Sequence, residues 1–287
     1  MNDSILALAA VWIQLTAEQR IALTHATSKK RLQPYRRALG GHERDALDLY
    51  VLDANIASLL HAQLRLVETV LREQIHRALS NAYGSSWYHV RPDGTTAAGL
   101  GNTCRSMVQD AVGALRREGG GGRGKPQRLA PDKVIAELML GFWAKTLDTP
   151  GDADHARTIW AAGVENAFNQ RQHQHASAWS QDQAKKMCHR LTWARNRVNH
   201  CESVVFGFPQ KGMQHQGKQL RLPPSMILES CRTLVGRFDG ELEAWMRNST
   251  DIDQLIAEPL AQAAWADVEG RASVTTPSSA PSNMWDL

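Results

Sequence analysis

Hydrophobic residues recur at helical spacing along most of this chain, and the alternation that marks strands is almost absent. Between Leu47 and Leu79, apolar side chains repeat every three or four positions for more than thirty residues. That spacing places one apolar stripe along a long helix, or along a closely joined pair of helices. Asn81 and Gly84 mark its end.

The same periodicity predicts shorter helices on either side. An earlier helix would begin after Ser28 as its N-cap and stop at Gly40-Gly41, with Pro34 inside it. Glycine and proline interrupt the rhythm between 84 and 101, and Pro131 suits the first turn of a helix. Later helices are expected over 102–117, 133–147, 155–170, 179–198, 225–246 and 251–268.

These elements predict an all-α fold, a helical bundle forming a single domain over residues 1–270. An irregular insertion is expected at about 84–130. Its glycine run at 119–122 lacks the Lys-Ser/Thr ending of a phosphate loop, so we interpret it as a flexible linker. Over 271–287, Ser, Thr, Pro and Ala replace the periodic pattern, which predicts a disordered tail.

Composition narrows the class of protein. With 287 residues, 43% of them hydrophobic and 22% charged, the chain is neither wholly disordered nor a disulfide-stapled miniprotein. Its four cysteines form no CxxC pair, which favours a reducing cytoplasm. The longest apolar run, Ile5 to Ile13, is too short to span a bilayer, so no membrane partner is expected.

Positive charge is concentrated in the body of the chain. Residues 249–287 hold six acids and one base, a net charge of −5, which leaves +9 on residues 1–248. Three stretches carry most of the bases: 29–37, 105–128 and 185–221. Each could be a solvated helix face, but three together favour a polyanionic partner such as RNA.

The segment from Trp193 to Glu202 contains residue types that could cleave a phosphodiester. Arg195 is a permanent cation able to grip phosphate, and His200 can give or take a proton near neutral pH. Asn196 stands four residues before His200 and could orient its imidazole. Arg195 stands five before, so a straight helix would separate the two by about 140°. They could meet only at a distorted turn or across a two-fold interface.

Two other interpretations of these residues remain open. His200 could cap the end of a helix or lie satisfied in the core. A zinc site could use His173, His175, the Cys188-His189 pair and the His200-Cys201 pair, but their spacings match no usual zinc module. We therefore expect no metal and no cofactor.

An ordered set of motifs resembles the HEPN superfamily, and more closely its Abi-like (abortive infection, AbiD/AbiF-type) branch. The set comprises Tyr50 and Asn55, then Glu68 to Ile75, then Leu140 to Trp143, and last Arg195-Asn196 followed by His200. Their order and rough spacing agree from about residue 29 to 245. Relatives commonly continue with a second His and an Arg-Leu-Trp-Asn-like run, which this chain replaces by Cys201 to Val205.

The resemblance implies a HEPN-like helical bundle that forms a two-fold homodimer and acts as a metal-independent endoribonuclease. The enzyme would be a cytoplasmic toxin or antiphage effector, with an antitoxin RNA or protein as a possible partner. His200 would act as base or acid, Arg195 would stabilise the transition state and Asn196 would orient His200. A helical dimer that holds a structured noncoding RNA without cutting it is the alternative.

Further residues are expected to support that site. Arg197, Lys185, Lys186 and Arg190 would contact the RNA backbone. Glu68 and Arg72 could be a helix-surface ion pair or could lie near the cleft, as their recurrence in the family implies. We expect Tyr50 and Asn55 to serve packing and local hydrogen bonding more than catalysis. Core packing also accounts better than base stacking for the nine tryptophans, which include Trp143, Trp160, Trp179 and Trp193.

Overall fold

The fold is mostly helical, in agreement with the predicted class. The structure, a computed structural model, describes residues 15–118, 129–148, 158–169, 178–215, 217–271 and 274–275. Within these ranges the elements are helices, apart from three strands that form one small sheet. The described helices include none that is both long and apolar enough to cross a membrane. The glycine run at 119–122 lies outside the described residues.

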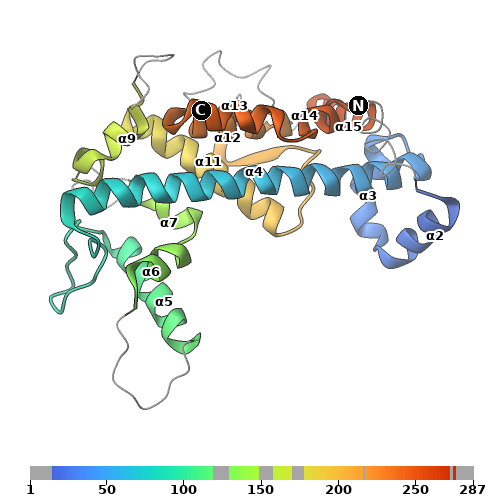
Figure 1. Cartoon of the computed structure of the whole chain (residues 1–287). Helices are drawn as coiled ribbons and strands as arrows, with labels where there is room; N and C mark the ends of the chain where they lie inside the picture. Colours follow the sequence, from blue (N-terminus) through green and yellow to red (C-terminus); the bar gives the residue numbers. More distant parts are fainter. Residues whose placement is uncertain are drawn as a thin grey trace, which may run out of the picture. The chain divides into compact units, whose positions relative to one another are not determined.

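The apolar stripe lies on one uninterrupted helix, α4 (Glu43–Tyr83), and not on a closely joined pair of helices (Figure 1). Leu60, Leu71 and Leu79 on that stripe have no exposed surface. The helix ends as predicted, because Gly84 adopts a left-handed conformation with φ of 82° and its N–H donates to the carbonyl of Ser80.

Two capped helices precede α4. In α2 (Ala17–Ala26) the Thr16 hydroxyl and the Gln19 side chain cap each other's backbone N–H groups. In α3 (Lys29–Ala38) the Ser28 hydroxyl accepts from the N–H of Arg31, which confirms the predicted cap. Pro34 lies inside α3 without shortening it, and the helix ends before Gly40 as expected.

Several predicted helices are shorter or broken. The one expected over 133–147 divides into α6 (Pro131–Glu137) and α7 (Leu140–Lys145), because Leu138 and Met139 are extended. The indole N–H of Trp143 donates to the Leu138 carbonyl at 2.9 Å and stabilises this break. The remaining helices of this part are α5 (Asn102–Glu118), a π-helix (Trp160–Val164), α9 (Glu165–Asn169) and α11 (Gln181–Asn199).

The helix expected over 225–246 also divides. It forms α12 (Pro224–Phe238) and α13 (Gly240–Asn248), with the Asp239 carboxylate between them accepting from the N–H of Leu242 at 2.9 Å. The last expected helix becomes α14 (Ile252–Ala257) and α15 (Pro259–Gly270). Pro259 forces the second break, because proline cannot continue a helix but suits its first turn.

A small sheet is the feature that periodicity did not predict. β1 (Phe208–His215) pairs antiparallel with β2 (Lys218–Leu222), in a register that joins Phe208 to Leu222 and is irregular after Pro209. β2 also pairs in parallel with β3 (Val274–Thr275), which lies in the segment expected to be a disordered tail. The other residues of that tail beyond Arg271 lie outside the described ranges.

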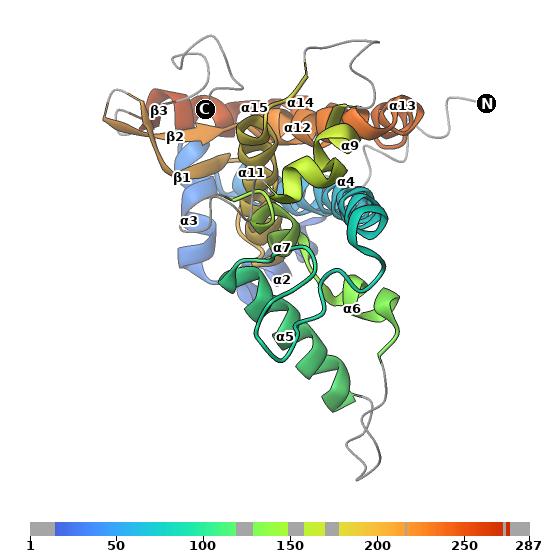
Figure 2. The same ribbon diagram turned by 90° about the vertical axis from the view of Figure 1, so that its left-hand side faces the viewer.

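The chain forms two compact units. The first contains residues 1–64, 193–230 and 244–287, and the second contains 65–192 and 231–243. In the first, α15 lies beside α3 and β3; in the second, α5 packs against α6 and α7 (Figure 2). Each change from one unit to the other falls inside a helix, namely α4, α11, α12 or α13, so no linker divides them. The single domain stays a prediction.

Candidate functional site

The predicted catalytic motif lies at the C-terminal end of α11. The N–H of His200 donates to the Asn196 carbonyl at 2.9 Å, which extends the helical pattern to His200. Cys201 then turns left-handed, with φ of 53°. The N–H groups of Cys201 and Glu202 return to the carbonyls of Val198 and Arg197, both at 3.0 Å. This pair of bonds is a Schellman motif with His200 as the C-cap residue.

The straight course of α11 decides how the motif residues are arranged. Because the helix is regular up to His200, Arg195 and His200 diverge by about 140° around its axis. Within one chain no distorted turn brings them together. Asn196 and His200 are one turn apart and both exposed, and Arg195 is half-buried. Of the two alternatives to catalysis, His200 does take the C-cap position, whereas its burial in the core is wrong because its side chain is exposed.

Three arginines from different elements surround the loop that follows His200, and we call them the arginine collar. Arg31 of α3 donates to the carbonyl of Cys201. Arg197 of α11 pairs with the Glu202 carboxylate at 2.6 Å. Arg221 of β2 donates to the carbonyls of Phe206 and Gly207, each at 2.9 Å. Main-chain oxygens accept from all three guanidinium groups, since Arg197 also donates to the carbonyl of Ser203 at 3.5 Å. The collar therefore fixes the loop and concentrates positive charge beside it.

The pKa values of the collar reflect this crowding. Burial, together with the charges of Arg197 and Arg271, lowers the pKa of Arg221 to about 10, while the Glu202 carboxylate opposes that shift. Burial also lowers the pKa of Arg197, while the Glu202 carboxylate opposes that shift. A pKa of about 10 still leaves a guanidinium charged at neutral pH, so the collar remains cationic.

A buried carboxylate holds the other side of the same loop. Asp53 of α4 is 5% exposed and accepts from the N–H groups of Val204 and Val205 at 2.8 and 2.9 Å. It also accepts from the Tyr35 hydroxyl at 2.5 Å. Burial raises the pKa of Asp53, although these hydrogen bonds act in the opposite direction. Tyr35 also meets Tyr50 edge to face at 5.3 Å.

The strained turn at Cys201 gives a prediction about stability. A left-handed conformation costs a non-glycine residue roughly 1–2 kcal/mol, and glycine adopts it freely at some cost in unfolded-state entropy. Cys201→Gly should therefore raise the free energy of unfolding by about 0.5–1 kcal/mol, measured by urea denaturation. Cys201→Ala keeps the strain and should give no gain. An equal gain from both variants would contradict this account.

Three of the predicted supporting residues of α11 lie in the second compact unit, namely Lys185, Lys186 and Arg190, whereas Arg197 lies in the first. Lys185 and Lys186 both pair with Asp182, at 3.0 and 3.3 Å, so part of their charge is already neutralised. Arg190 is only 4% exposed, and burial lowers its pKa to about 10. A side chain this buried does not reach a solvent-borne ligand, so Arg190 is corrected from an RNA contact to a structural support.

Glu68 and Arg72 also lie in the second unit, and they are less exposed than a helix-surface pair would be. Their side chains are 12% and 19% exposed, and their charged atoms are 3.3 Å apart. The same Glu68 oxygen accepts from the N–H of Leu140 at 3.0 Å, at the start of α7. Glu68 thus supplies the cap that α7 lacks from its own N-cap residue, Met139, and positions Phe142 and Trp143 in the core.

This contact predicts an asymmetry between two substitutions. Glu68→Ala leaves a partly buried N–H without its acceptor and should lower the free energy of unfolding by about 1–3 kcal/mol. Glu68→Gln keeps an acceptor oxygen and should cost less than about 1 kcal/mol. Chemical denaturation compares the two. If Gln costs as much as Ala, the ion pair with Arg72 matters more than the cap.

Other residues considered for chemistry are arranged as follows. His189 lies 3.6 Å from the Asp148 carboxylate, and Cys188 is buried with a pKa raised to about 12. His173 and His175 fall outside the described residues. In the part of the chain that the structure describes, no three His, Cys, Asp or Glu side chains gather as metal ligands would. Asn55 donates to the Val51 carbonyl at 2.9 Å, a local hydrogen bond as expected.

A second basic surface carries part of the 105–128 stretch. A hollow of about 490 Å³ in the second unit is lined by Arg91, Arg116 and His89, with Tyr88 and Val108 buried at its floor. Arg123, Lys125 and Arg128 of that stretch lie outside the described residues. The tryptophans follow the packing expectation at Trp87, Trp143 and Trp160, whereas Trp245 is 57% exposed.

Comparison of the chain with protein-family models, with curated proteins and with solved structures found no match.

Proposed function

We propose that the protein is a metal-independent endoribonuclease of the HEPN type. The observation that carries the proposal is an exposed imidazole, His200, held on a fixed helix end beside a loop ringed by the arginine collar. An imidazole moves protons near neutral pH, and clustered guanidinium groups bind phosphates. The same surface is therefore equipped both to hold RNA and to transfer a proton at its backbone.

The reaction follows from these groups. His200 takes the proton of a ribose 2′-OH, the 2′-oxygen attacks the adjacent phosphorus, and the bond to the 5′-oxygen breaks. A second imidazole, or His200 acting afterwards as an acid, gives a proton to the leaving oxygen. Arg195 stabilises the extra negative charge of the transition state. The products are a 2′,3′-cyclic phosphate and a 5′-hydroxyl, and DNA, without a 2′-OH, is inert.

A homodimer is part of the proposal. Arg195 and His200 of one chain diverge around α11, so one helix cannot present both to the same phosphate. A two-fold axis beside the end of α11 would set Arg195 of each copy against His200 of the other. Cells carrying such an enzyme need it silenced, which is consistent with a cytoplasmic toxin or antiphage effector held by an antitoxin RNA or protein.

The test is incubation of the purified protein with total RNA in the presence of a chelator, followed by mapping of the new ends. We expect cleavage with 2′,3′-cyclic phosphate and 5′-hydroxyl ends. A substrate with a single 2′-deoxy sugar at the mapped position should resist cutting there, while the neighbouring all-ribose control is cut. Recovery of one discrete, uncut RNA with the protein would instead support the non-cleaving RNA-binding dimer.

A further inference from the structure

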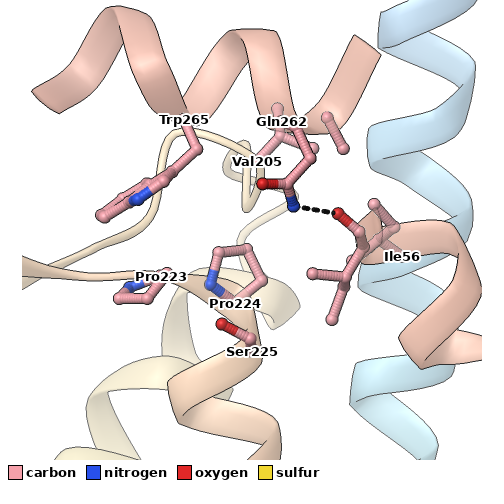
Figure 3. A pocket seen from close by; sticks show the side chains of 9 residues that line it. Ile56, Val205, Pro223, Pro224, Ser225, Gln262 and Trp265 are labelled. Atoms are coloured by element: carbon pink, nitrogen blue, oxygen red, sulfur yellow. Dashed lines mark hydrogen bonds between the residues drawn. The ribbon is translucent and has the colours of Figure 1, made fainter. Parts of the chain in front are cut away.

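A pocket in the first compact unit lies next to the loop that the arginine collar fixes. Its volume is about 210 Å³ (Figure 3). Its floor consists of buried apolar side chains, and its rim carries Ser225, Gln262 and Trp265 together with the ring of Pro223. The floor residues are Ile56, Val205, Pro224, Ile256 and Ala261.

Trp265 is held in place by a close approach to the backbone. A Cβ atom at Gly207 would come within 2.4 Å of the indole of Trp265, and Gly207 has φ of +71°. Only glycine therefore fits there. The carbonyl of this same Gly207 accepts from Arg221 at 2.9 Å, so one residue joins the wall of the pocket to the arginine collar.

The side-chain amide of Gln262, on the rim, is held in one orientation by a hydrogen bond. The side-chain N–H of Gln262 donates to the carbonyl of Ile256 at 2.7 Å, the dashed line in Figure 3. Because that nitrogen faces a carbonyl, the amide can take only one orientation, and its oxygen is left on the side of Trp265 and Val205. Gln262 therefore offers the pocket an acceptor.

We infer that this pocket binds a nucleobase that carries an exocyclic amino group. A flat ring would lie between the indole of Trp265 and the rings of Pro223 and Pro224, as bases stack on aromatic side chains in single-stranded RNA complexes. An amino group on its edge, as in adenine, cytosine or guanine, would donate to the Gln262 oxygen. Uracil has a carbonyl in place of that amino group and would leave the oxygen without this donor.

Size and charge argue against a drug-sized ligand and against a phosphate group inside the pocket. Sites for drug-sized ligands measure about 300–1,000 Å³, so this pocket suits one ring system rather than a longer molecule. Among its described lining residues none is charged, so a phosphate would not be held inside it. The attached ribose and phosphate would lie outside, and the collar beside the loop is the nearby group able to hold them. The inference deepens the proposed function and rests on it, because RNA is the polymer that would carry the base to the pocket.

The test uses binding of single mononucleotides, which needs no cleavage. Protein-observed NMR titration of the full chain with AMP, CMP, GMP and UMP should give saturable binding for the three amino-bearing nucleotides and about tenfold weaker binding for UMP. Gln262→Leu should remove that preference. Gln254→Leu, an exposed glutamine that does not line the pocket, should leave it unchanged. Trp265→Leu should weaken all four nucleotides by about tenfold or more.

The outcomes separate this inference from the nuclease proposal. If the protein cuts no RNA but binds mononucleotides with a preference that Gln262→Leu alters, the nucleobase pocket is supported and the nuclease proposal is contradicted. If the protein cuts RNA but binds no mononucleotide, the nucleobase pocket is contradicted and the nuclease proposal stands. Equal binding of all four nucleotides by a folded Gln262→Leu variant and by the wild-type protein would also overturn the inference, even if Trp265→Leu failed to fold.

Discussion

His200→Ala and Arg195→Ala should each abolish RNA cleavage without unfolding the protein. Removing a general acid–base group costs about 100-fold to 10,000-fold in rate, and removing a group that stabilises transition-state charge costs about 100-fold to 1,000-fold. The fold should survive because the His200 side chain is exposed and its backbone makes the hydrogen bonds that end α11. Initial cleavage rates and circular dichroism of the same preparations measure both effects.

Matched controls exist on the same unit. His42 and Arg44 are an exposed histidine and an exposed arginine at the start of α4. Their alanine variants remove the same chemical groups from a surface outside the proposed site, so both should cleave at the wild-type rate. Persistent cleavage by purified His200→Ala, with His42→Ala equally active, would show that the imidazole assigned here does not carry the reaction.

Mixed dimers test the two-fold arrangement itself. A dimer of one Arg195→Ala chain and one His200→Ala chain retains one intact arginine and one intact histidine. If the site is composite, mixing equal amounts of the two inactive proteins should restore up to about a quarter of the wild-type rate. Random exchange makes about half of the dimers mixed, and each mixed dimer has one intact Arg195–His200 pair instead of two. A mixture that exchanges subunits, shown by a labelled partner, and still fails to cleave would contradict a site shared between chains.

Much of the fold could be predicted because the apolar stripe is a local signal. Leu60, Leu71 and Leu79 recur at helical spacing, and all three are fully buried in α4. The hairpin was missed because β1 contains Pro209 and Gly212 and has little alternation. The breaks at 138–139 and at Asp239 were missed because they depend on hydrogen bonds that form only in the folded chain.

The candidate site was predictable in its chemistry but not in its geometry. Arg195, Asn196 and His200 could be found from residue type and spacing alone. Arg31 and Arg221 were visible as charge in two basic stretches, but only the tertiary fold brings them, 190 residues apart, to one loop. Asp53 was missed because the sequence alone gives no reason to bury a single acid within an apolar stripe. Only the folded chain shows the hydrogen-bond donors that surround this carboxylate.

Asp53→Ala should have the largest effect on stability of any substitution near the site. It leaves two buried N–H groups, those of Val204 and Val205, and the Tyr35 hydroxyl without their acceptor. Each orphaned donor costs about 1–3 kcal/mol, so the loss of an acceptor for three donors is about 3–9 kcal/mol, against a total stability of about 5–15 kcal/mol for a typical domain. Urea denaturation measures it, and Tyr35→Phe, which removes one donor instead of the acceptor, should cost only about 1 kcal/mol.

Asp53→Asn separates the charge of this side chain from its hydrogen bonds. The amide oxygen can still accept from Val204 and Val205, while its nitrogen faces Tyr35, whose hydroxyl can turn to accept. Because burial raises the pKa of Asp53 in the folded state, the folded protein binds this proton more tightly than the unfolded chain does. The wild-type free energy of unfolding should therefore fall, relative to Asp53→Asn, as pH rises from about 4 through the raised pKa, and then level off. Subtracting the two pH profiles cancels the other titrating groups. A difference that rises with pH would mean that hydrogen bonds from the 204–205 backbone outweigh burial and hold Asp53 ionised.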